Sequence, residues 1–417
     1  MAQLSDDCFA FGGELMKSDE ALALLGERLN VVVGTEKVPL QAATGRILAE
    51  DIVSALPVPP HDNAAVDGYA VRYTDLAPEG ETPLPLAGRI PAGEREERRL
   101  SKGQAIRIFT GAPMPAGADT VLMQEDCRET ADGVVIPPGI KSGANRRFAG
   151  EDIAAGETIL KTGSRLRPQE IGLAASIGRT SLLVYKPVHV ALFSTGDEVR
   201  DAGDDLPPGC IYDANRYSVG AALDRLGCDV NDLGILPDTY SVIRETLSRA
   251  AEDHDLIMTS GGVSTGEEDH IRAAVESLGS IHFWRLAIRP GRPLALGQIG
   301  PVPFVGLPGN PVAVLVTFMR FARPAILRLG GCNRTEPDSF QVRAGFELRK
   351  KLGRREWLRV RIDRDDDGAP VARKFPRDGA GILTSMVQSD GLVELPEELT
   401  ELAPGTMVDY LPFSEIV

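Results

Sequence analysis

Between about residues 186 and 330 the sequence alternates between short apolar runs and helical patterns. The apolar runs cover 189–194, 230–236, 256–259 and 302–307, and the helical patterns cover 216–226, 240–251, 268–278 and 312–321. Repeated strand–helix units of this length are typical of a parallel sheet with helices on both faces. This alternation therefore predicts a doubly wound α/β domain, and it constrains the fold more than any other feature of the chain.

The sequence on either side of this segment follows other patterns. Helices are expected from Ser18, over 41–51 and over 168–177, whereas 56–154 reads as brief strands bounded by Gly, Pro and Asp. Past Gly330 the apolar residues alternate with a period of two. The 417-residue chain is therefore predicted to be an α/β multidomain protein with four parts: a helical region at 1–55 and 155–185, an inserted β-rich domain at 56–154, the α/β domain at 186–330 and a C-terminal β domain at 331–417.

The charge balance restricts the class of partner. The chain carries 45 Lys and Arg against 60 Asp and Glu, a formal net charge of −15. Because binding to nucleic acids or anionic membranes depends on clustered basic residues, neither partner is expected. A small anionic substrate remains possible, but it requires a local basic pocket. The five cysteines contain no CxxC pair and the five histidines no HExxH motif, so neither a disulfide framework nor a zinc site is indicated.

Two segments bear on localisation. The first 17 residues lack the basic and apolar parts of a signal peptide. The longest stretch without a charged residue, 293–319, contains five prolines and four glycines, which would break a membrane-spanning helix. We therefore expect a cytoplasmic protein.

Three loops of the α/β segment each follow an apolar run and precede a helix. They cover Ser194–Glu198, Ser260–Asp269 and Gly306–Pro311. In open α/β sheets, ligands bind outside the carboxyl ends of the strands, where glycines let the backbone approach an anion. A single loop of this kind could be an ordinary turn, but three at separate strand ends predict a ligand site. None of them is a Walker loop or a GxGxxG motif.

Charged residues near these loops offer further candidates. Arg285, Arg289 and Arg292 flank the Pro290-Gly291 turn, and planar guanidinium groups suit oxyanions and phosphates. The alternative is a solvated or carboxylate-paired surface cluster. Six acidic residues and two histidines could take part in chemistry, although each alone could equally be a helix cap or a solvated side chain: Asp62, Asp152, Glu198, Asp213, Asp238, Asp269, His61 and His270.

Seven motifs occur in one order along the chain. The segment 60–70, PHDNAAVDGYA, has the pattern PxDNxxxDGYA, and it is followed by RIFTGAP at 107–113, GEDI at 150–153, STGDE at 194–198, IYDAN at 211–215, TSGGVS at 259–264 and GLPGNP at 306–311. The motifs lie between residues 60 and 311. Over essentially its whole length, the sequence resembles the molybdopterin molybdenumtransferase family, of the MoeA type that the E domain of gephyrin shares.

This resemblance implies an elongated protomer and a homodimer, with a molybdopterin-binding α/β domain and a C-terminal β-barrel-like domain. It implies magnesium-dependent hydrolysis of adenylylated molybdopterin, with release of AMP, coupled to the transfer of molybdate. Mg²⁺ is the implied cofactor, molybdate and adenylylated molybdopterin are the implied substrates, and a molybdopterin adenylyltransferase is the implied upstream partner. Carboxylate-held Mg²⁺ polarising a phosphoanhydride is compatible with the acidic candidates.

The resemblance also implies roles for individual residues. The catalytic set comprises Asp62, Thr110, Asp152, Glu198 and Asp238. The substrate-binding set comprises Asp213, Asn215, Ser260, Gly261, Gly262, Ser264, Asp269, Pro308, Gly309, Asn310 and Pro311. The oxyanion-binding set comprises Arg285, Arg289, Pro290, Arg292 and Arg359, and the Mg²⁺ ligands are Glu198, Asp238 and Asp269.

The chain departs from the family pattern around the oxyanion. Arginines stand where the family has the lysines of KxxxKPGKP, and Ala313 and Ala380 stand where it has hydroxyl groups. Two alternatives to a molybdenumtransferase therefore stay open. One is a non-catalytic homologue that binds molybdopterin or acts as a scaffold, and the other is a paralogue that uses tungstate.

Overall fold

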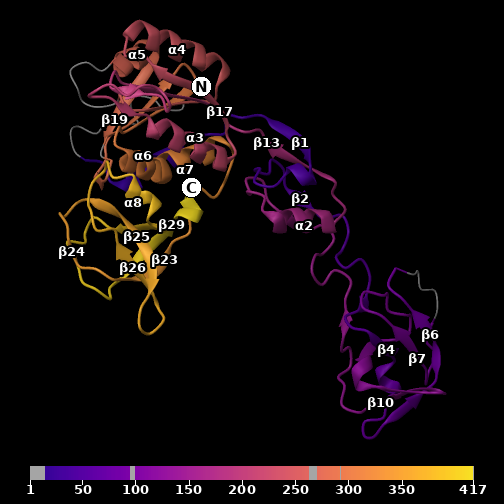
Figure 1. Cartoon of the computed structure of the whole chain (residues 1–417). Coiled ribbons are helices and arrows are strands. Elements are labelled where there is room, and N and C mark those ends of the chain that lie inside the picture. Colours follow the sequence, from indigo (N-terminus) through magenta and orange to yellow (C-terminus); the bar gives the residue numbers. More distant parts are fainter. Residues whose placement is uncertain (1–14, 94–98, 263–269, 292, 417) are drawn as a thin grey trace.

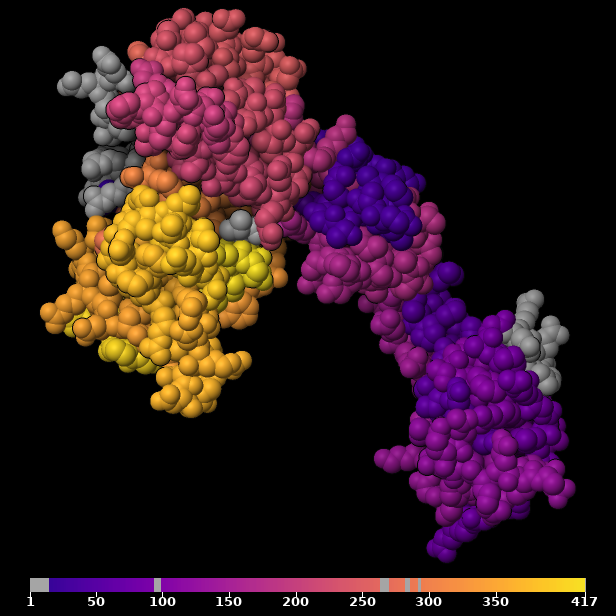
Figure 2. Space-filling view, in the orientation of Figure 1, coloured from indigo at the N-terminus to yellow at the C-terminus, as the bar shows by residue number. Residues whose placement is uncertain are grey.

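The computed structural model describes residues 15–93, 99–262, 270–291 and 293–416. Figure 1 shows an elongated molecule with the α/β module (188–330) and the barrel (340–412) at one end, the inserted region (63–147) at the other, and a middle lobe (35–53 with 158–185) between them. Only a narrow connection joins the inserted region to the middle lobe in Figure 2. Within these ranges, no helix is long and apolar enough to cross a membrane.

The α/β module is built on a six-stranded sheet in the order β17, β14, β18, β22, β21, β19. The first four strands are parallel to one another, whereas β21 pairs antiparallel with both β22 and β19. The strands are β14 His189–Thr195, β17 Asp229–Leu236, β18 Leu256–Ser260, β19 Gly279–Arg285, β21 Pro293–Ile299 and β22 Val302–Leu307. The doubly wound sheet is confirmed, and the antiparallel pair at its edge is an addition that the alternation did not predict.

Helices cover both faces of this sheet because successive strand residues point to opposite sides. Val190 and Leu192 of β14 share a core with Val219 of α3, whereas Ala191 and Phe193 share a second core with residues of α4 and α5. The helices are α3 Ala214–Leu226, α4 Tyr240–Asp253 and α5 His270–Leu278. A short ribbon of β15 Val199–Arg200 and β16 Ile211–Tyr212 follows β14.

The helix expected over 312–321 is longer than the sequence indicated. It runs as α6 Pro311–Thr317, the π-helical turn η5 Phe318–Ala322 and α7 Arg323–Leu329. Pro324 has no N–H to donate, and the looser π turn before it lets the helix continue. Helix α1 Ser18–Arg28 packs against α7 and shares the core of the α/β module through Ala21 and Leu25.

The middle lobe contains β1 Thr35–Pro39 paired with β13 Ser181–Tyr185, β2 Ile52–Val53 paired with β12 Thr158–Leu160, the 3-10 turn η2 Leu40–Ala42 and helix α2 Pro168–Ser176. The helix expected over 41–51 is wrong. Residues 41 and 42 end the 3-10 turn, Gly45 adopts φ +80° in a turn, and Ala49 donates its N–H to the Leu183 carbonyl, so no α-helix forms over this segment. Helix α1 packs with the α/β module, although its residues were predicted to belong to the helical region at 1–55 and 155–185. The bounds of the four parts remain predictions.

The inserted region is made of short strands, as expected. Four of them form the sheet β6-β7-β4-β8, three form β5-β10-β9, and β3 pairs with β11. The elements are β3 Asn63–Ala64, β4 Gly68–Val71, η3 Tyr73–Asp75, β5 Thr82–Leu84, β6 Leu86–Ile90, β7 Ala105–Ile108, β8 Thr120–Met123, η4 Gln124–Asp126, β9 Arg128–Thr130, β10 Gly133–Ile136 and β11 Arg146–Arg147.

The C-terminal domain closes into a five-stranded barrel, because β25 pairs with both β26 and β27. Its elements are β23 Phe340–Ala344, β24 Leu348–Arg349, β25 Arg355–Arg364, β26 Pro370–Lys374, α8 Thr384–Val387, β27 Gly391–Leu395, β28 Glu401–Leu402, β29 Met407–Pro412 and α9 Phe413–Ile416. Strand β20 Ile288–Arg289, which follows β19, pairs with β25 and joins the barrel to the α/β module. The α/β multidomain prediction with a C-terminal barrel is confirmed.

Candidate functional site

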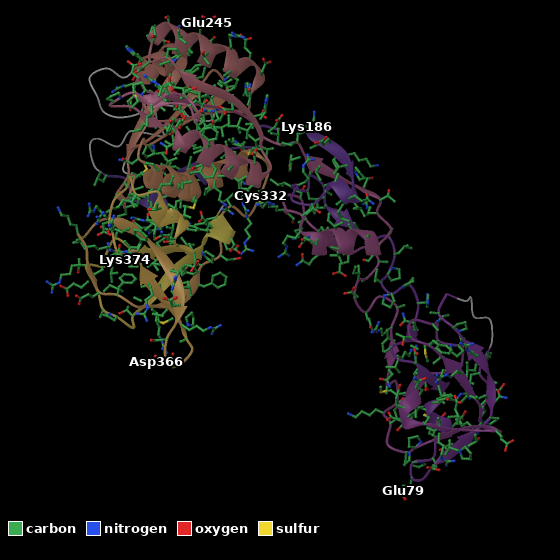
Figure 3. The ribbon with its side chains drawn as sticks, viewed as in Figure 1. Glu79, Lys186, Glu245, Cys332, Asp366 and Lys374 are labelled. Carbon is green, nitrogen blue, oxygen red and sulfur yellow. The ribbon has the colours of Figure 1, made fainter. Side chains whose placement is uncertain are left out.

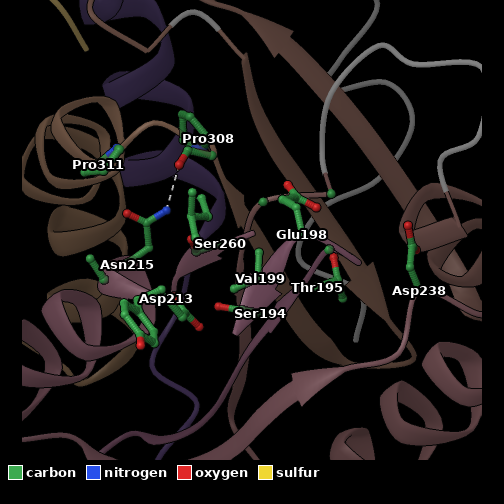
Figure 4. Close-up of a pocket in the computed structure, with 17 residues that line it drawn as sticks. Ser194, Thr195, Glu198, Val199, Asp213, Asn215, Asp238, Ser260, Pro308 and Pro311 are labelled. Atoms are coloured by element: carbon green, nitrogen blue, oxygen red, sulfur yellow. Dashed lines mark hydrogen bonds between the residues drawn. The ribbon is translucent and has the colours of Figure 1, made fainter. Parts of the chain in front are cut away.

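A cavity of about 320 Å³ lies at the carboxyl ends of β14, β18 and β22, where the three predicted loops meet. Figure 4 shows its lining residues. Ten of the predicted site residues line it: Glu198, Asp213, Asn215, Asp238, Ser260, Gly261, Gly262, Pro308, Gly309 and Pro311. The structure therefore brings most of the predicted substrate-binding residues together.

Two hydroxyl groups in this cavity have no internal partner. Ser194 Oγ and Thr195 Oγ1 are buried, and neither forms a hydrogen bond with any residue that the structure describes. Unpaired buried hydroxyl groups are costly, so a ligand that pairs with them would be stabilised. Gly262 packs closely against Thr195, because a Cβ there would lie 2.5 Å from both Thr195 Oγ1 and Ile271 Cδ1, and the residue adopts φ +64°.

Ser194 and Thr195 were not among the predicted site residues, although they belong to the first of the three predicted loops. The available signal was the pair of hydroxyl residues at the end of an apolar strand. Ile211 and Tyr212, whose exposed side chains line the same cavity, were not predicted as site residues either.

Glu198 and Asp238 place two exposed carboxylates in the cavity wall (Figure 4). Their oxygens suit Mg²⁺, which is usually held by one or two carboxylates together with waters and substrate phosphates. In the described ranges, no group of three potential metal ligands lies together. The third predicted ligand, Asp269, lies outside the described residues, as does Ser264. The two carboxylates fit a magnesium ion that the substrate helps to bind.

Asp213 and Asn215 hold the cavity wall in place. Asp213 caps α3 by accepting from the Arg216 N–H at 3.0 Å, and its buried carboxylate also pairs with Arg216 Nε at 3.2 Å. Asn215 Nδ2 donates to the Gly309 carbonyl at 2.7 Å, which links α3 to the third loop. The Asp213 carboxylate is thus already used within the protein, whereas Asn215 keeps its carbonyl oxygen for other contacts.

Some of the residues predicted to bind the oxyanion belong to the part of the chain that the structure describes. They lie beside the start of α6, next to the cavity. Arg289 is half exposed and pairs with the buried Glu356 at 3.4 Å. Arg359 is buried and donates to Ser385 Oγ at 3.0 Å. Burial lowers the pKa of Arg359, and nearby Arg289 lowers it further. Asp378 acts in the opposite direction and raises this pKa, and no carboxylate in the described ranges forms an ion pair with Arg359, so its charge is only partly compensated.

The two alanines that replace hydroxyl residues lie at this same place. The Val312 N–H donates to the Ala380 carbonyl at 2.8 Å, so the 379–381 loop touches the start of α6 beside Asn310. A Cβ on Gly291, which follows Pro290, would lie 3.5 Å from the Ala313 Cβ. Arg292 and the side chain of Arg285 lie outside the described residues.

Three predicted catalytic residues lie elsewhere. Asp62 directly precedes β3 and Thr110 follows β7 of the inserted region, and Asp152 lies in the connection between β11 and β12. Figure 1 shows the inserted region at the opposite end of the molecule from the α/β module. The Ala149 N–H donates to the Asp62 carboxylate at 2.8 Å, and Arg146 Nε donates to it at 3.0 Å. These contacts hold the pKa of Asp62 below its ordinary value. One protomer does not bring this set together with Glu198.

Thr110 is also paired locally. Its N–H and Oγ1 both donate to the Asp67 carboxylate, at 2.7 and 2.6 Å, and this lowers the pKa of Asp67. The Asp152 side chain is exposed, and its backbone N–H donates to the Val58 carbonyl at 3.0 Å.

Comparison with known proteins matches three family models in succession. Residues 16–178 match the MoeA N-terminal region (domains I and II), residues 191–328 match a probable molybdopterin binding domain, and residues 341–413 match the MoeA C-terminal region (domain IV). The matches follow the order and extent of the parts seen in the structure.

Full-length relatives agree with these matches. A molybdopterin molybdenumtransferase of Haemophilus influenzae is 36% identical over 97% of this chain and 100% of its own length. One from a Nostoc species is 38% identical over 89% of this chain and 87% of its own. The solved structure of the molybdopterin biosynthesis MoeA protein of Pyrococcus horikoshii OT3 superposes with a TM-score of 0.81 at 29% identity, covering 96% of this chain and all of that one.

Proposed function

Because the chain belongs to the molybdopterin molybdenumtransferase family of the MoeA type, and is an enzyme of molybdenum cofactor biosynthesis, we propose that it binds adenylylated molybdopterin in the cavity of the α/β module. It releases AMP in a magnesium-dependent step and transfers molybdenum from molybdate to the pterin dithiolene. The observation that carries this proposal is the cavity itself, with two unpaired buried hydroxyl groups beside two exposed carboxylates.

Each part of the site has a task in this reaction. Ser194 and Thr195 donate hydrogen bonds to the phosphate-bearing part of the substrate, which replaces the partners that they lack. Glu198 and Asp238 hold Mg²⁺, which when bound stabilises charge on the phosphoanhydride that is hydrolysed. Arg359, which forms no ion pair with a described carboxylate, attracts the molybdate dianion to the start of α6.

A homodimer would account for the distance between the two predicted catalytic sets. Asp62 and Thr110 belong to the inserted region and Asp152 to its connection, and a second copy whose inserted region reaches the cavity would place them beside Glu198. We propose this arrangement, with a molybdopterin adenylyltransferase supplying the substrate in the cytoplasm.

The test of the function uses purified protein with adenylylated molybdopterin, molybdate and Mg²⁺. The proposal expects AMP release that depends on both Mg²⁺ and molybdate, and rescue of a strain that lacks its molybdenum insertase. A protein that binds molybdopterin but releases no AMP would instead be the non-catalytic homologue.

The oxyanion site gives a second test, because Ala313 and Ala380 remove hydroxyl groups there and favour a changed anion preference. Arg289→Ala should weaken molybdate binding by about 1.5–3 kcal/mol, roughly 10- to 150-fold, the scale of a charge-assisted hydrogen bond. Arg289→Lys should be partly tolerated. Glu356 keeps Arg354 as a partner at 3.1 Å, so the alanine variant does not leave it unpaired.

Calorimetric titration of molybdate and of tungstate into wild type and both variants measures this effect. Equal affinity in all three proteins would show that Arg289 does not hold the anion. Tighter binding of tungstate than of molybdate by the wild type would favour the tungstate-using alternative.

A further inference from the structure

A second large cavity lies where the middle lobe meets the α/β module, and we call it the junction cavity. It measures about 610 Å³, within the range of about 300–1,000 Å³ that is typical of small-molecule sites. The loop at 163–168 and the turn at 44–45 form one wall, and the start of α7 with residues 332–338 forms the other. Figure 3 labels Cys332 at this junction.

Arg323 provides a buried positive charge in this cavity. The residue is 8% exposed, and within the described part of the chain its Nη1 donates to the Thr335 carbonyl at 2.8 Å. No carboxylate in the described ranges forms an ion pair with it. Burial lowers the pKa of Arg323, and the nearby Arg165 lowers it further. A buried guanidinium that has only a carbonyl partner is poorly compensated.

Arg165 faces the same cavity from the opposite wall. Its Nη2 donates to the Arg225 carbonyl at 3.0 Å and its Nε to the Gly45 carbonyl at 3.4 Å, and it too forms no ion pair with a described carboxylate. Both guanidinium groups line the same cavity, and the charge of Arg165 disfavours that of Arg323. An anion between them would remove this repulsion and satisfy their remaining N–H groups.

The other charges of the wall are largely neutralised locally. Arg167 pairs with Glu170 at 2.5 Å, and Arg334 pairs with Asp338. Glu336 lies 3.9 Å from Arg320. Four arginines and four carboxylates line the cavity, so its wall is neutral overall. Arg165 and Arg323 are the two of these arginines that form no ion pair with a described carboxylate, so the space between them is locally positive and suits an anion.

We propose that the junction cavity binds a phosphate monoester. The phosphate lies between Arg165 and Arg323, where two planar forks can each donate to its oxygens. The organic part packs against the apolar side chains that line the same space, Leu166, Pro168, Leu327 and Pro337. Because the two walls belong to different parts of the molecule, the bound ligand also holds the middle lobe against the α/β module.

The test uses inorganic phosphate and ribose 5-phosphate as probes, titrated by calorimetry and by thermal unfolding of the full chain. Wild type should bind both saturably, with ribose 5-phosphate tighter because it also contacts the apolar wall. Arg323→Gln and Arg165→Gln should each weaken binding by about 10- to 100-fold. Arg165 is the less buried of the two, so its variant keeps the test valid if Arg323→Gln does not fold.

Two control variants separate this site from other effects. Arg343→Gln removes an arginine that pairs with Asp367 at 2.5 Å on the barrel, and it should bind both probes like wild type. Glu198→Gln changes an exposed residue of the α/β cavity and should also leave this binding unchanged, so the result does not depend on the proposed function.

Three outcomes would overturn the proposal. The first is no saturable binding of either probe to wild type, and the second is equal binding by wild type and both arginine variants. The third is a loss of self-association in the arginine variants without any effect of phosphate, since a carboxylate of a second copy would then be the occupant.

Discussion

The cavity of the α/β module and the inserted region hold their polar residues in opposite states. In the cavity, Ser194 and Thr195 are buried without partners. In the inserted region, Asp62 accepts from Ala149 and Arg146, and Thr110 donates twice to Asp67. Polar groups without internal partners indicate where a ligand binds, whereas groups that are satisfied locally can maintain the shape of a loop. Motifs that resemble the family pattern equally closely therefore place their polar residues in different physical environments.

The largest effect expected from this difference is on catalysis. Glu198→Gln should lower AMP release by about 100- to 1,000-fold, the scale of losing one preorganised electrostatic group. The midpoint of thermal unfolding should hardly change, because the Glu198 side chain is exposed. Asp197→Asn, an exposed neighbour that does not line the cavity, is the matched control. An active Glu198→Gln enzyme would remove this carboxylate from the mechanism.

Mixed dimers test whether the inserted region completes the cavity of a second copy. If Asp62 acts across a dimer, mixing inactive Asp62→Asn and Glu198→Gln proteins in equal amounts should restore activity. Half of the dimers are then mixed and each has one intact site, so the expected recovery is about one quarter of wild type. Activity that stays absent after confirmed subunit exchange would contradict a site shared between copies.

A smaller effect concerns the stability of the inserted region. Asp62→Asn should lower the free energy of unfolding by about 1 kcal/mol, because a partly exposed charged contact is weakened by solvent. The pKa of Asp62 is lower in the folded protein, so its contribution is complete above the ordinary value of 3.8 and disappears as the pH falls through the folded value.

Urea unfolding at about pH 7 and about pH 3.5 measures this contribution, with exposed Asp132→Asn as the control. The difference between wild type and Asp62→Asn should shrink at the lower pH. A difference that is independent of pH would mean that the Asp62 charge does not stabilise the loop.

Much of the fold could be predicted from the sequence, because alternation and apolar period are local signals. The strand–helix alternation located β14, β18 and β22. The antiparallel strands β19 and β21 were missed because no helix separates them from each other or from β22, so they fall outside the strand–helix alternation. The helix expected over 41–51 failed because Gly45 and pairing with distant Leu183 override the local preference of an alanine-rich segment.

The site could be predicted only in part. The three loops identified the cavity because parallel strands bring their carboxyl ends to one edge of a sheet. The unpaired state of the Ser194 and Thr195 hydroxyl groups depends on packing, which no sequence motif reports. The same holds for the separation of Asp62 from Glu198, since it follows from the arrangement of the lobes and not from spacing along the chain.

The central claim is that molybdopterin binds in the α/β cavity, and its most direct test is the affinity for molybdopterin, followed by pterin fluorescence. Thr195→Val removes one unpaired buried hydroxyl group, and it should weaken binding roughly 10-fold, about one hydrogen bond, without loss of stability. Asp62→Asn should bind molybdopterin like wild type. Unchanged affinity in Thr195→Val together with lost affinity in Asp62→Asn would contradict the claim and place the pterin in the inserted region.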